Sequence, residues 1–147
     1  MSASVLYMSM SLDGYIAGPN DELGRGLGDG GERLHYWGVT PDGEFFRPPG
    51  PSVANYPLVT YVTDGIASAM AQAKAAAGDR NVMVHGAYTA QRALEAAVLD
   101  ELEIHQIPVL FGGGRRLFEV LASRVELEIV RVIDTPQATH IRYRVRR

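Results

Sequence analysis

The middle of the chain alternates short apolar runs with helix-forming runs, and this alternation constrains the fold more than any other feature. Apolar runs at 58–62 and 81–85 are each followed by a helix-forming run, at 65–77 and 87–97. Strands that alternate with helices in this way form parallel βαβ units. The pattern therefore predicts an α/β fold built on a largely parallel sheet.

Further strands are predicted towards both ends of the sequence. Residues 3–12 are apolar and lead into a turn, which indicates a buried central strand, and residues 101–109 alternate with a period of two. Two more runs, 125–133 and 138–145, flank a turn-forming segment and predict an antiparallel hairpin. We expect one α/β domain over residues 1–147, with a mixed, mostly parallel sheet, flanking helices and a C-terminal hairpin.

The segments between these elements are rich in glycine and proline. Residues 18–31 contain six glycines and are expected to form a loop, whereas residues 32–37 can form a short helix. Residues 38–57 contain five prolines, which predicts an irregular segment without a long helix or strand. A short helical turn is expected at 116–121.

The composition argues against several classes of protein. The chain has 147 residues, 46% of them hydrophobic, which is enough for a buried core, and its lack of cysteine excludes disulfide scaffolds and thiolate metal sites. A net charge of -3 gives no electrostatic case for binding nucleic acid. The sequence lacks the roughly 18 consecutive apolar residues that a membrane span requires. We therefore expect a cytoplasmic protein whose partners include neither nucleic acid nor membrane.

Asp13, in the turn after the first predicted strand, is the first candidate functional residue. Open α/β sheets place their ligand crevice at the carboxyl ends of the strands. A carboxylate at this position can therefore orient a substrate in a catalytic site. The alternative is a turn residue whose carboxylate caps its own backbone.

The second candidate is the glycine triplet Gly112, Gly113 and Gly114, which Arg115 and Arg116 follow. Successive backbone amides can form a nest for an anion, and the arginines would add positive charge. This segment is therefore predicted to bind a phosphate or another anionic group of a substrate. The alternative is a flexible turn with solvated arginines.

His85 ends a predicted strand at the edge of the sheet where a crevice is expected. It can donate a hydrogen bond or transfer a proton near neutral pH, and the alternative is a structural histidine at the rim of the crevice. Together with His35, His105 and His140, it shows none of the spacings typical of metal ligands. We therefore expect no metal site.

Six motifs follow one another in a specific order along the chain. They are VLYMSMSLDGYIAG (5–18), LGDGGERLHYW (27–37), VTDGIASAMAQAKAAAG (62–78), NVMVHGA (81–87), LDELEIHQIPVLFGGGRRLF (99–118) and HIRYRV (140–145). Together they resemble the dihydrofolate reductase superfamily, and within it the group similar to the RibD C-terminal reductase domain. The resemblance covers about residues 1–37 and 58–147.

The resemblance implies an enzyme in which NADPH delivers a hydride to a pyrimidine- or pterin-like ring. It also implies that the protein is a homodimer. On this basis Asp13 would lie beside the substrate ring and orient it. Ala17 and Gly18 would contact the nicotinamide through a closely approaching backbone.

Other positions take their expected roles from the same resemblance. Gly86 and Ala87 precede a predicted helix and would contact the cofactor, because a helix N-terminus suits a diphosphate. The substrate would contact His85, the glycine triplet and Arg116.

Two departures from the family pattern concern the cofactor. Residues 38–57 stand where the family has two arginine-bearing motifs that grip the cofactor phosphates, and their one arginine is Arg47. At Gly86 the family has two adjacent glycines. Each charge-assisted hydrogen bond that is lost removes about 1.5–3 kcal/mol. We therefore expect weak discrimination between NADPH and NADH.

Two alternatives to a reductase remain open. One is a non-catalytic, shortened paralogue that keeps the fold and the dimer but has lost NADPH binding. The other is cofactor-independent use of the same pocket. A measurement of NADPH binding distinguishes the reductase from both.

Overall fold

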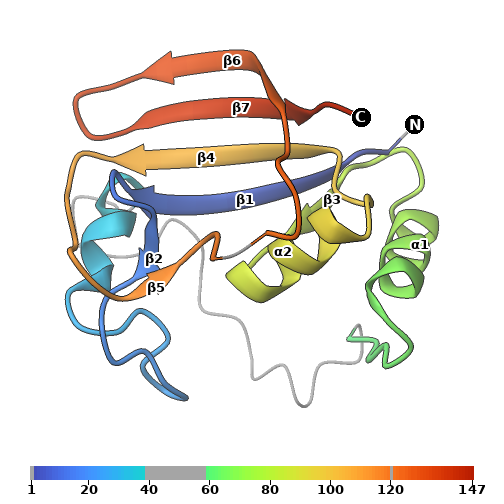
Figure 1. Ribbon diagram of the computed structural model, residues 1–147, viewed down its shortest axis with the longest axis horizontal. Helices are drawn as coiled ribbons and strands as arrows, with labels where there is room; N and C mark the ends of the chain where they lie inside the picture. The colour runs from blue at the N-terminus through green and yellow to red at the C-terminus, as the bar shows by residue number, and fades with distance from the viewer. Residues whose placement is uncertain (1, 39–58, 120) are drawn as a thin grey trace.

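A five-stranded mixed sheet forms the centre of the molecule (Figure 1). The structure is a computed structural model that describes residues 2–38, 59–119 and 121–147. The strand order is β3-β1-β4-β7-β6, with the bounds β1 Ser4–Ser11, β3 Val82–Val84, β4 Glu101–Ile107, β6 Leu127–Asp134 and β7 Thr139–Val145. β1 runs parallel to β3 and β4, whereas β4, β7 and β6 pair antiparallel. The predicted mixed sheet with a C-terminal hairpin is confirmed.

β1 lies at the centre of the sheet, as its apolar sequence predicts. Val5 pairs with Met83 on one side and with Glu101 on the other. The start of the strand is held by Ser4, whose amide donates to Asp100 Oδ2 at 2.8 Å. Both neighbours of β1 therefore come from the second half of the chain.

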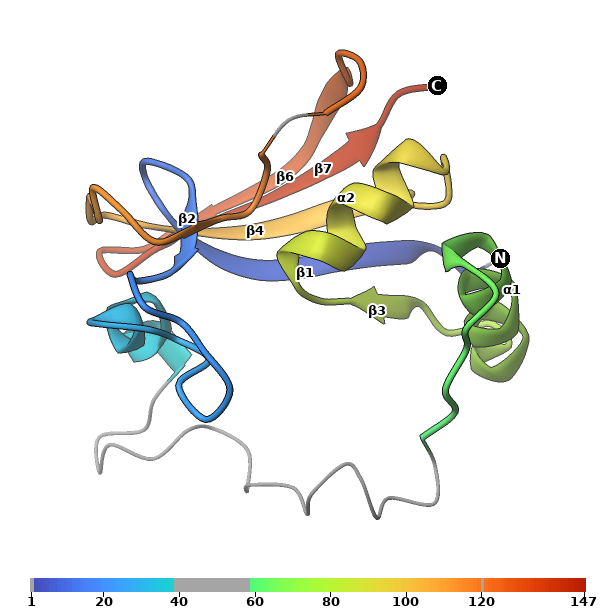
Figure 2. The same cartoon turned by 60° about the horizontal axis from the view of Figure 1, so that its bottom comes forward.

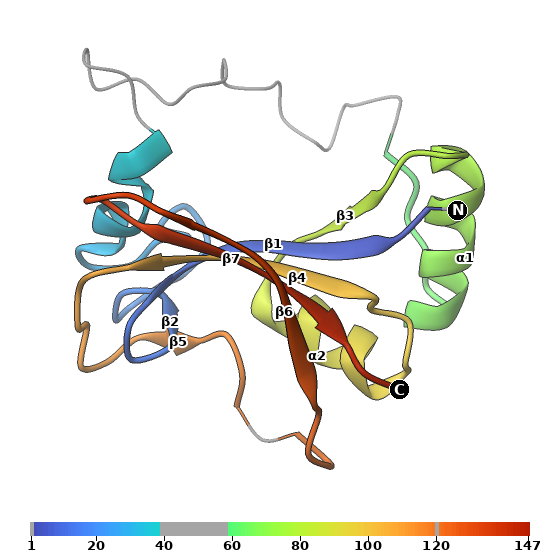
Figure 3. The ribbon, with the colours of Figure 1, turned by 90° about the horizontal axis from the view of Figure 1, so that it is seen from above.

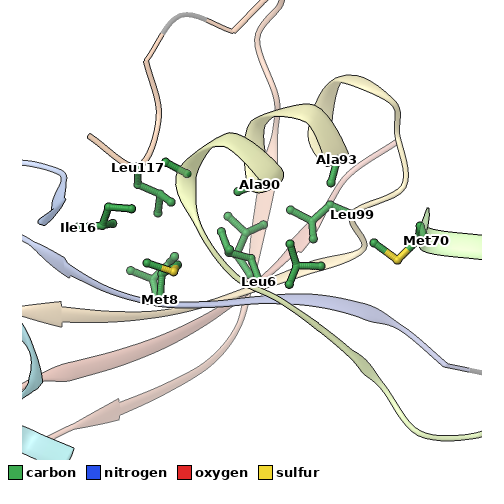
Figure 4. Close-up of a cluster of buried hydrophobic side chains, with 12 residues drawn as sticks. Leu6, Met8, Ile16, Met70, Ala90, Ala93, Leu99 and Leu117 are labelled. Atoms are coloured by element: carbon green, nitrogen blue, oxygen red, sulfur yellow. The ribbon is translucent and has the colours of Figure 1, made fainter. Parts of the chain in front are cut away.

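The helix α2 (Ala87–Glu95) covers one face of the sheet and closes the main core (Figures 2 and 4). Its alanines Ala90 and Ala93 are fully buried, and their small side chains let the helix approach the strands closely. The core beneath the helix contains Leu6, Met8, Ile16, Met70, Val84, Leu99, Leu102, Ile104 and Leu117. Because side chains alternate along a strand, the even-numbered apolar positions of β1 and β4 point to this face.

The helix α1 (Ile66–Ala77) packs beside β3 at one edge of the sheet. It begins after Gly65, at φ 108°, and ends at Gly78, at φ 62°. Glycine adopts positive φ without the steric cost that a Cβ brings, so these two residues define the ends of the helix. Met70 is its buried side chain and joins the core under α2.

The 3-10 helix η1 (Gly31–Gly38) lies on the face of the sheet opposite α2 (Figure 3). Its Leu34 is fully buried and forms a second, smaller core with Ile107 and Ala138. The short helix predicted at 32–37 is therefore confirmed.

A short ribbon stands at the carboxyl end of β1, where β2 (Tyr15–Ala17) pairs antiparallel with β5 (Arg115–Arg116). The helical turn expected at 116–121 is wrong for the described part of that range, which contains no helix. The Leu117 amide instead donates to the Gly14 carbonyl at 3.0 Å. Pairing with β2 thus overrides the local helical preference of this segment.

The strand expected at 58–62 is wrong over the described residues 59–62, which carry no regular structure. Tyr61 is 75% exposed. β-branched and aromatic residues favour a strand only where a neighbouring strand receives them, and none of the described strands pairs here. The expectation of an irregular segment at 38–57 falls outside the described residues, except for Gly38 at the end of η1.

β6 forms the other edge of the sheet and carries exposed apolar side chains. Ile129 and Val132 are 62% and 53% exposed. β7 lies between β4 and β6, so Arg142 and Arg144 stand on an inner strand of the sheet. There they pair with glutamates on β4 and β6.

Candidate functional site

Asp13 fastens the glycine loop to the end of β1. Its Oδ1 accepts hydrogen bonds from the Ser11 hydroxyl at 2.6 Å and from the Phe111 amide at 3.0 Å. Its Oδ2 accepts one from the Gly112 amide at 2.8 Å. Amides of the loop that the sequence assigns to a ligand anion therefore bind a carboxylate of the chain itself.

These bonds keep the Asp13 carboxylate charged. The Ser11 hydroxyl lowers the pKa of Asp13 most, burial opposes it, and the Gly112 and Phe111 amides lower it further, from 3.8 to about 2. A carboxylate in this state does not exchange protons near neutral pH. Its geometry suits a positioning role for the loop beside the site.

Gly18 and Gly114 lie where two stretches of backbone pack against each other. A Cβ added to Gly114 would come closer than 3.0 Å to the Ala17 carbonyl, and one added to Gly18 would collide with the Asp29 carbonyl. Ala17 itself is 2% exposed. Packing within the chain alone therefore requires small residues here, and a contact of Ala17 and Gly18 with a nicotinamide stays a prediction.

The two arginines after the glycine loop have different partners. Arg115 forms an ion pair with Asp21. Arg116 lies over the Tyr15 ring, 4.8 Å from its centroid, and donates to the Asp13 carbonyl oxygen at 3.4 Å. Arg116 is thus the arginine of the pair that brings positive charge to the Asp13 end of the site.

His85, Gly86 and Ala87 form a second group, at the junction of β3 and α2. Gly86 caps the helix at φ 95°, and its amide donates to Met8 Sδ at 3.3 Å. A Cβ at this position would meet no atom of the described residues within 4 Å, and the first turn of α2 contains no acidic residue. An open helix N-terminus of this kind is favourable for an anion. His85 Nδ1 contacts the Tyr7 carbonyl at 2.8 Å.

The two groups stand at different points along β1. β3 pairs with β1 up to Leu6. The stretch of β1 from residue 7 to residue 11, roughly 13 Å of strand, therefore separates His85 from the Asp13 turn.

On the side away from α2, this stretch of β1 and its neighbours on β4 and β7 present a set of side chains that we call the polar face. It consists of Tyr7, Ser9, Glu103, His105, His140 and Arg142.

A cluster of rings occupies one row of the polar face. His105 Nδ1 and His140 Nδ1 are 2.6 Å apart. Trp37 of η1 lies against both rings, with centroid distances of 4.5 and 5.0 Å, and its Nε1 donates to Ser9 Oγ at 3.0 Å. Tyr7 meets His105 edge-on at 4.3 Å. The row therefore offers flat surfaces and polar ring edges side by side.

Two atoms of the polar face, His105 Nε2 and Glu103 Oε2, are buried without a hydrogen-bond partner among the described residues. His105 is 3% exposed and Glu103 is 6% exposed. The other oxygen of Glu103 pairs with Arg131 at 2.8 Å, and Arg142 stands 3.7 Å from Oε2. Because buried polar atoms nearly always have partners, these two mark a place where a ligand would complete the bonding.

Burial and neighbouring charges keep several of these groups neutral. Burial, followed by the charges of His140 and His35, lowers the pKa of His105 to about 4. Burial and then His85 lower the pKa of His35. Burial and then the charge of Glu103 raise the pKa of Tyr7. These dependences link His105 with His140 and His35, and His35 with His85.

The sequence predicts His85 as a site residue but does not single out His105, His140 or Trp37. His105 could have been found from the alternation of polar and apolar residues along its strand. Glu103 and His105 alternate with the apolar Leu102 and Ile104, and that alternation by itself is typical of a strand with one solvated face. Only the packing of Trp37 of η1 against His105 and His140 shows that this face is covered.

A family model described as the RibD C-terminal domain matches residues 53–141. This match covers more than half of the chain, including β3, α2, β4 and most of the C-terminal hairpin. The chain belongs to this family. The resemblance drawn from the six sequence motifs is thereby confirmed, and with it the dihydrofolate reductase-like architecture.

Solved structures of RibD-type proteins share the fold of this RibD C-terminal domain. A protein of Shewanella sp. PV-4 named for riboflavin biosynthesis is 20% identical, with a TM-score of 0.65 and 99% of each chain covered. The Saccharomyces cerevisiae riboflavin biosynthesis reductase Rib7 is 14% identical, with a TM-score of 0.57 over 99% of this chain and 89% of that one. No curated protein matches the sequence.

A bifunctional relative from Thermotoga maritima is named as a diaminohydroxyphosphoribosylaminopyrimidine deaminase and 5-amino-6-(5-phosphoribosylamino)uracil reductase. It is 12% identical, with a TM-score of 0.61, and the comparison covers 98% of this chain and 56% of that chain. Likeness at these identities shows the fold alone.

Among the described residues, no helix has the length and apolar character that crossing a membrane requires.

Proposed function

We propose that this RibD C-terminal domain is an NADPH-dependent reductase of a pyrimidine-like ring that carries a sugar phosphate. We further propose that it works in the cytoplasm as a homodimer. Family membership supports the reaction type, and the name of the Thermotoga relative suggests the substrate class. The observation that carries the proposal is the polar face, which lies between the Asp13 loop and the N-terminus of α2.

The chemistry of the polar face suits a flat heterocycle with polar edges. Trp37 and Tyr7 offer aromatic surface, on which a planar ring can stack or pack edge-on. His105 Nε2 and Glu103 Oε2, which have no hydrogen-bond partner in the described part of the chain, offer hydrogen bonds to ring nitrogens, amino groups or carbonyls. A site with buried polar atoms discriminates strongly against analogues that cannot complete its bonds.

The junction of β3 and α2 fits the diphosphate of a nicotinamide cofactor. Gly86 leaves open space at the helix N-terminus, and no acidic side chain opposes an anion in the first turn. Gly86 and Ala87 would hold the diphosphate through their backbone. When bound, NADPH supplies the hydride for the reduction. Because the arginine-bearing motifs of the family are absent from the sequence, this grip relies on the backbone and the helix dipole.

The residues of the chain would divide the remaining work. Asp13 holds the glycine loop in place through the Phe111 and Gly112 amides. Arg116, beside Asp13, would meet an anionic group of the substrate. The polar face would orient the ring and exclude water from it, so that catalysis depends on placing the acceptor carbon against the hydride donor.

The test is incubation of the protein with NADPH and 5-amino-6-(5-phosphoribosylamino)uracil. Oxidation of NADPH is followed by its absorbance, and the product is identified by a mass gain of two hydrogens. We expect turnover by the natural sequence and a loss of at least about tenfold in Asp13→Asn, since a transition-state contact weakened by about 1.4 kcal/mol gives that factor. Arg124→Gln, which changes an 88%-exposed side chain, is the matched control and should behave as the natural sequence.

The competing function is a non-catalytic paralogue that keeps the fold. The missing arginine motifs favour it, because they remove direct contacts to the cofactor phosphates. Titration with NADPH, read by the fluorescence of Trp37, decides between the two. A dissociation constant below roughly 50 μM, or about -6 kcal/mol, supports the reductase, and no binding at millimolar NADPH refutes it. NADPH binding without reduction of the uracil compound would refute the substrate class.

A further inference from the structure

His105 and His140 face each other through the same ring atom. Their Nδ1 atoms are 2.6 Å apart, across the paired strands β4 and β7. Two Nδ1 atoms can share a hydrogen bond only if one of them carries a proton and the other does not. The contact therefore couples the protonation of the two rings.

This coupling determines what His105 Nε2 offers to a ligand. A neutral imidazole carries its proton on one nitrogen only. When His140 donates its Nδ1 proton, a neutral His105 must carry its own proton on Nε2, which is then a donor. When His140 accepts instead, the His105 proton is on Nδ1, and Nε2 is an acceptor.

The two rings differ in their exposure to solvent, and this difference separates their roles in the pair. His105 is 3% exposed, and its Nε2 is buried with no hydrogen-bond partner among residues 2–38, 59–119 and 121–147. His140 is half-buried and lies one strand closer to the β6 edge. Burial and nearby positive charge lower the pKa of His105 to about 4, so this ring stays neutral near neutral pH. His140 is therefore the ring of the pair that has access to solvent.

We propose that His105 is a catalytic residue that donates its Nε2 proton to the bound substrate, while a protonated His140 passes its Nδ1 proton to His105 Nδ1 so that no imidazolate forms. This inference rests on the proposed function. Reduction of a C=N or C=O bond needs a hydride on carbon, from the reduced nicotinamide of that proposal, and a proton on the heteroatom. The π electron pair moves to the heteroatom, which takes the proton from His105 Nε2. As this proton leaves, His105 Nδ1 takes a proton from the Nδ1 of a protonated His140, so that both rings end neutral. When the product leaves, His105 Nε2 takes a proton from water that enters the site, and the proton on its Nδ1 returns to His140.

Trp37 covers the relay formed by His105 and His140. Its indole packs against both imidazoles and is held to Ser9 by one hydrogen bond of 3.0 Å. A substrate ring that reaches His105 Nε2 must replace part of this contact. Since the sequence contains one tryptophan, its fluorescence reports whether a ligand has reached the relay.

Other titratable or charged groups face the pair from each element packed around it. They are Tyr7 on β1, Glu103 on β4 and Arg142 on β7, together with His35 on η1, which is influenced in turn by His85 after β3. Each of them influences the pH at which the pair changes state. The test therefore compares variants that leave this surrounding set intact.

The first experiment is a pH titration of the ligand-free protein with ¹⁵N-labelled histidine, followed by NMR. In the natural sequence, acidification through the range in which imidazoles take up protons should move the His105 proton from Nδ1 to Nε2. In His140→Phe, which keeps a ring against Trp37 but has no nitrogen, this tautomer change should disappear. A His105 tautomer that ignores pH in the natural sequence, or responds equally in the variant, overturns the relay.

The second experiment measures turnover under the conditions of the proposed function. His140→Phe should lower kcat by at least about tenfold, with KM within about twofold, because general acid catalysis contributes about 10²–10⁴ to such steps. It should also remove one limb of the pH–rate profile. His105→Gln, which retains an N–H donor but cannot pass a proton on, should show the same kcat loss. An unchanged kcat, or equal effects on kcat and KM that follow a loss of thermal stability, overturns the catalytic role.

The two experiments separate failure of the relay from failure of the function. If the natural sequence binds no NADPH and turns nothing over, the proposed function and the catalytic use of the relay both fall. The NMR titration then still shows whether the two histidines share a proton. If turnover occurs but the His105 tautomer does not follow His140, the function stands and the relay is refuted.

Discussion

The glycine triplet after β4 contains three positions that the structure treats differently, and a series of alanine substitutions measures the difference. Gly113 has ordinary backbone geometry, and a Cβ there would lie 3.8 Å from Pro19 Cγ. Gly112 has φ 73°, and a Cβ there would have no neighbour within 4 Å in the part of the chain that the structure describes. Gly114 has φ 129°, and its Cβ would come closer than 3.0 Å to the Ala17 carbonyl.

The expected costs follow from these geometries. Gly113→Ala should lie between no change and a gain of about 1 kcal/mol, because it only reduces the freedom of the unfolded chain. Gly112→Ala places an L residue at positive φ, which costs about 1–2 kcal/mol. Gly114→Ala adds backbone strain of about 1–3 kcal/mol to overpacking against a rigid backbone of about 1–3 kcal/mol. The sum for Gly114→Ala is about 2–6 kcal/mol.

Urea and thermal unfolding of the three variants provide the assay. For a chain of this size, each kcal/mol shifts Tm by roughly 2–4 °C, so Gly114→Ala should lose at least about 4 °C. Gly112→Ala should fall between the other two variants. If Gly114→Ala is no less stable than Gly112→Ala, close packing against Ala17 is not the reason that position 114 requires glycine. If Gly113→Ala is the most damaging of the three, the reasoning fails altogether.

Three further predictions concern the site and the assembly. Because the folded pKa of Asp13 is lowered from 3.8 to about 2, its bonds stabilise the loop above about pH 4 and are lost as the pH falls through about 2. The hydrogen-exchange rate of the Gly112 amide, corrected for its intrinsic pH dependence, should therefore stay low from pH 8 to about pH 4 and rise only below that. A rise that begins near pH 6 would contradict the hydrogen bond from this amide to an ionised Asp13. The exposed apolar side chains of β6 should bring two copies of the protein together at this edge. Light scattering should therefore show a dimer, and Ile129→Lys should dissociate it. A monomeric natural protein would show that this edge is not a dimer contact. Calorimetry at roughly 0.15 M salt should give an NADPH to NADH affinity ratio below about tenfold, or 1.4 kcal/mol, whereas a ratio near a hundredfold would reveal a specific phosphate site.

The strands of the sheet were predictable because their apolar periodicity is local. The run at 101–109 has a period of two and forms β4, and the two C-terminal runs form the predicted hairpin. The same criteria fail at 58–62, because apolar β-branched residues make a strand only when a partner strand is present. They also fail at Arg116, where pairing with Tyr15 decides the conformation.

In the candidate site too, some residues could be predicted from the sequence and others only from the structure. Asp13 and the glycine triplet stand out in the sequence, and the structure joins them through the Phe111 and Gly112 amides. Which anion those amides bind was not predictable, since the contact spans about a hundred residues. His105 and His140 form a pair only because β4 and β7 adopt one register, and register depends on the whole sheet rather than on either strand.

The central position of β1 has a consequence for how the molecule folds. The hydrogen bonds that flank its start join residues 78 and 96 positions apart, to Asn81 and Asp100. Closing loops of this length costs entropy before any contact compensates it, whereas β3, α2 and β4 follow one another closely. We therefore expect these later elements to assemble first and β1 to insert last. Asp13 follows β1 and Gly86 follows β3, so the two ends of the candidate site come together only in that final step, and binding competence should appear with the slowest phase of refolding.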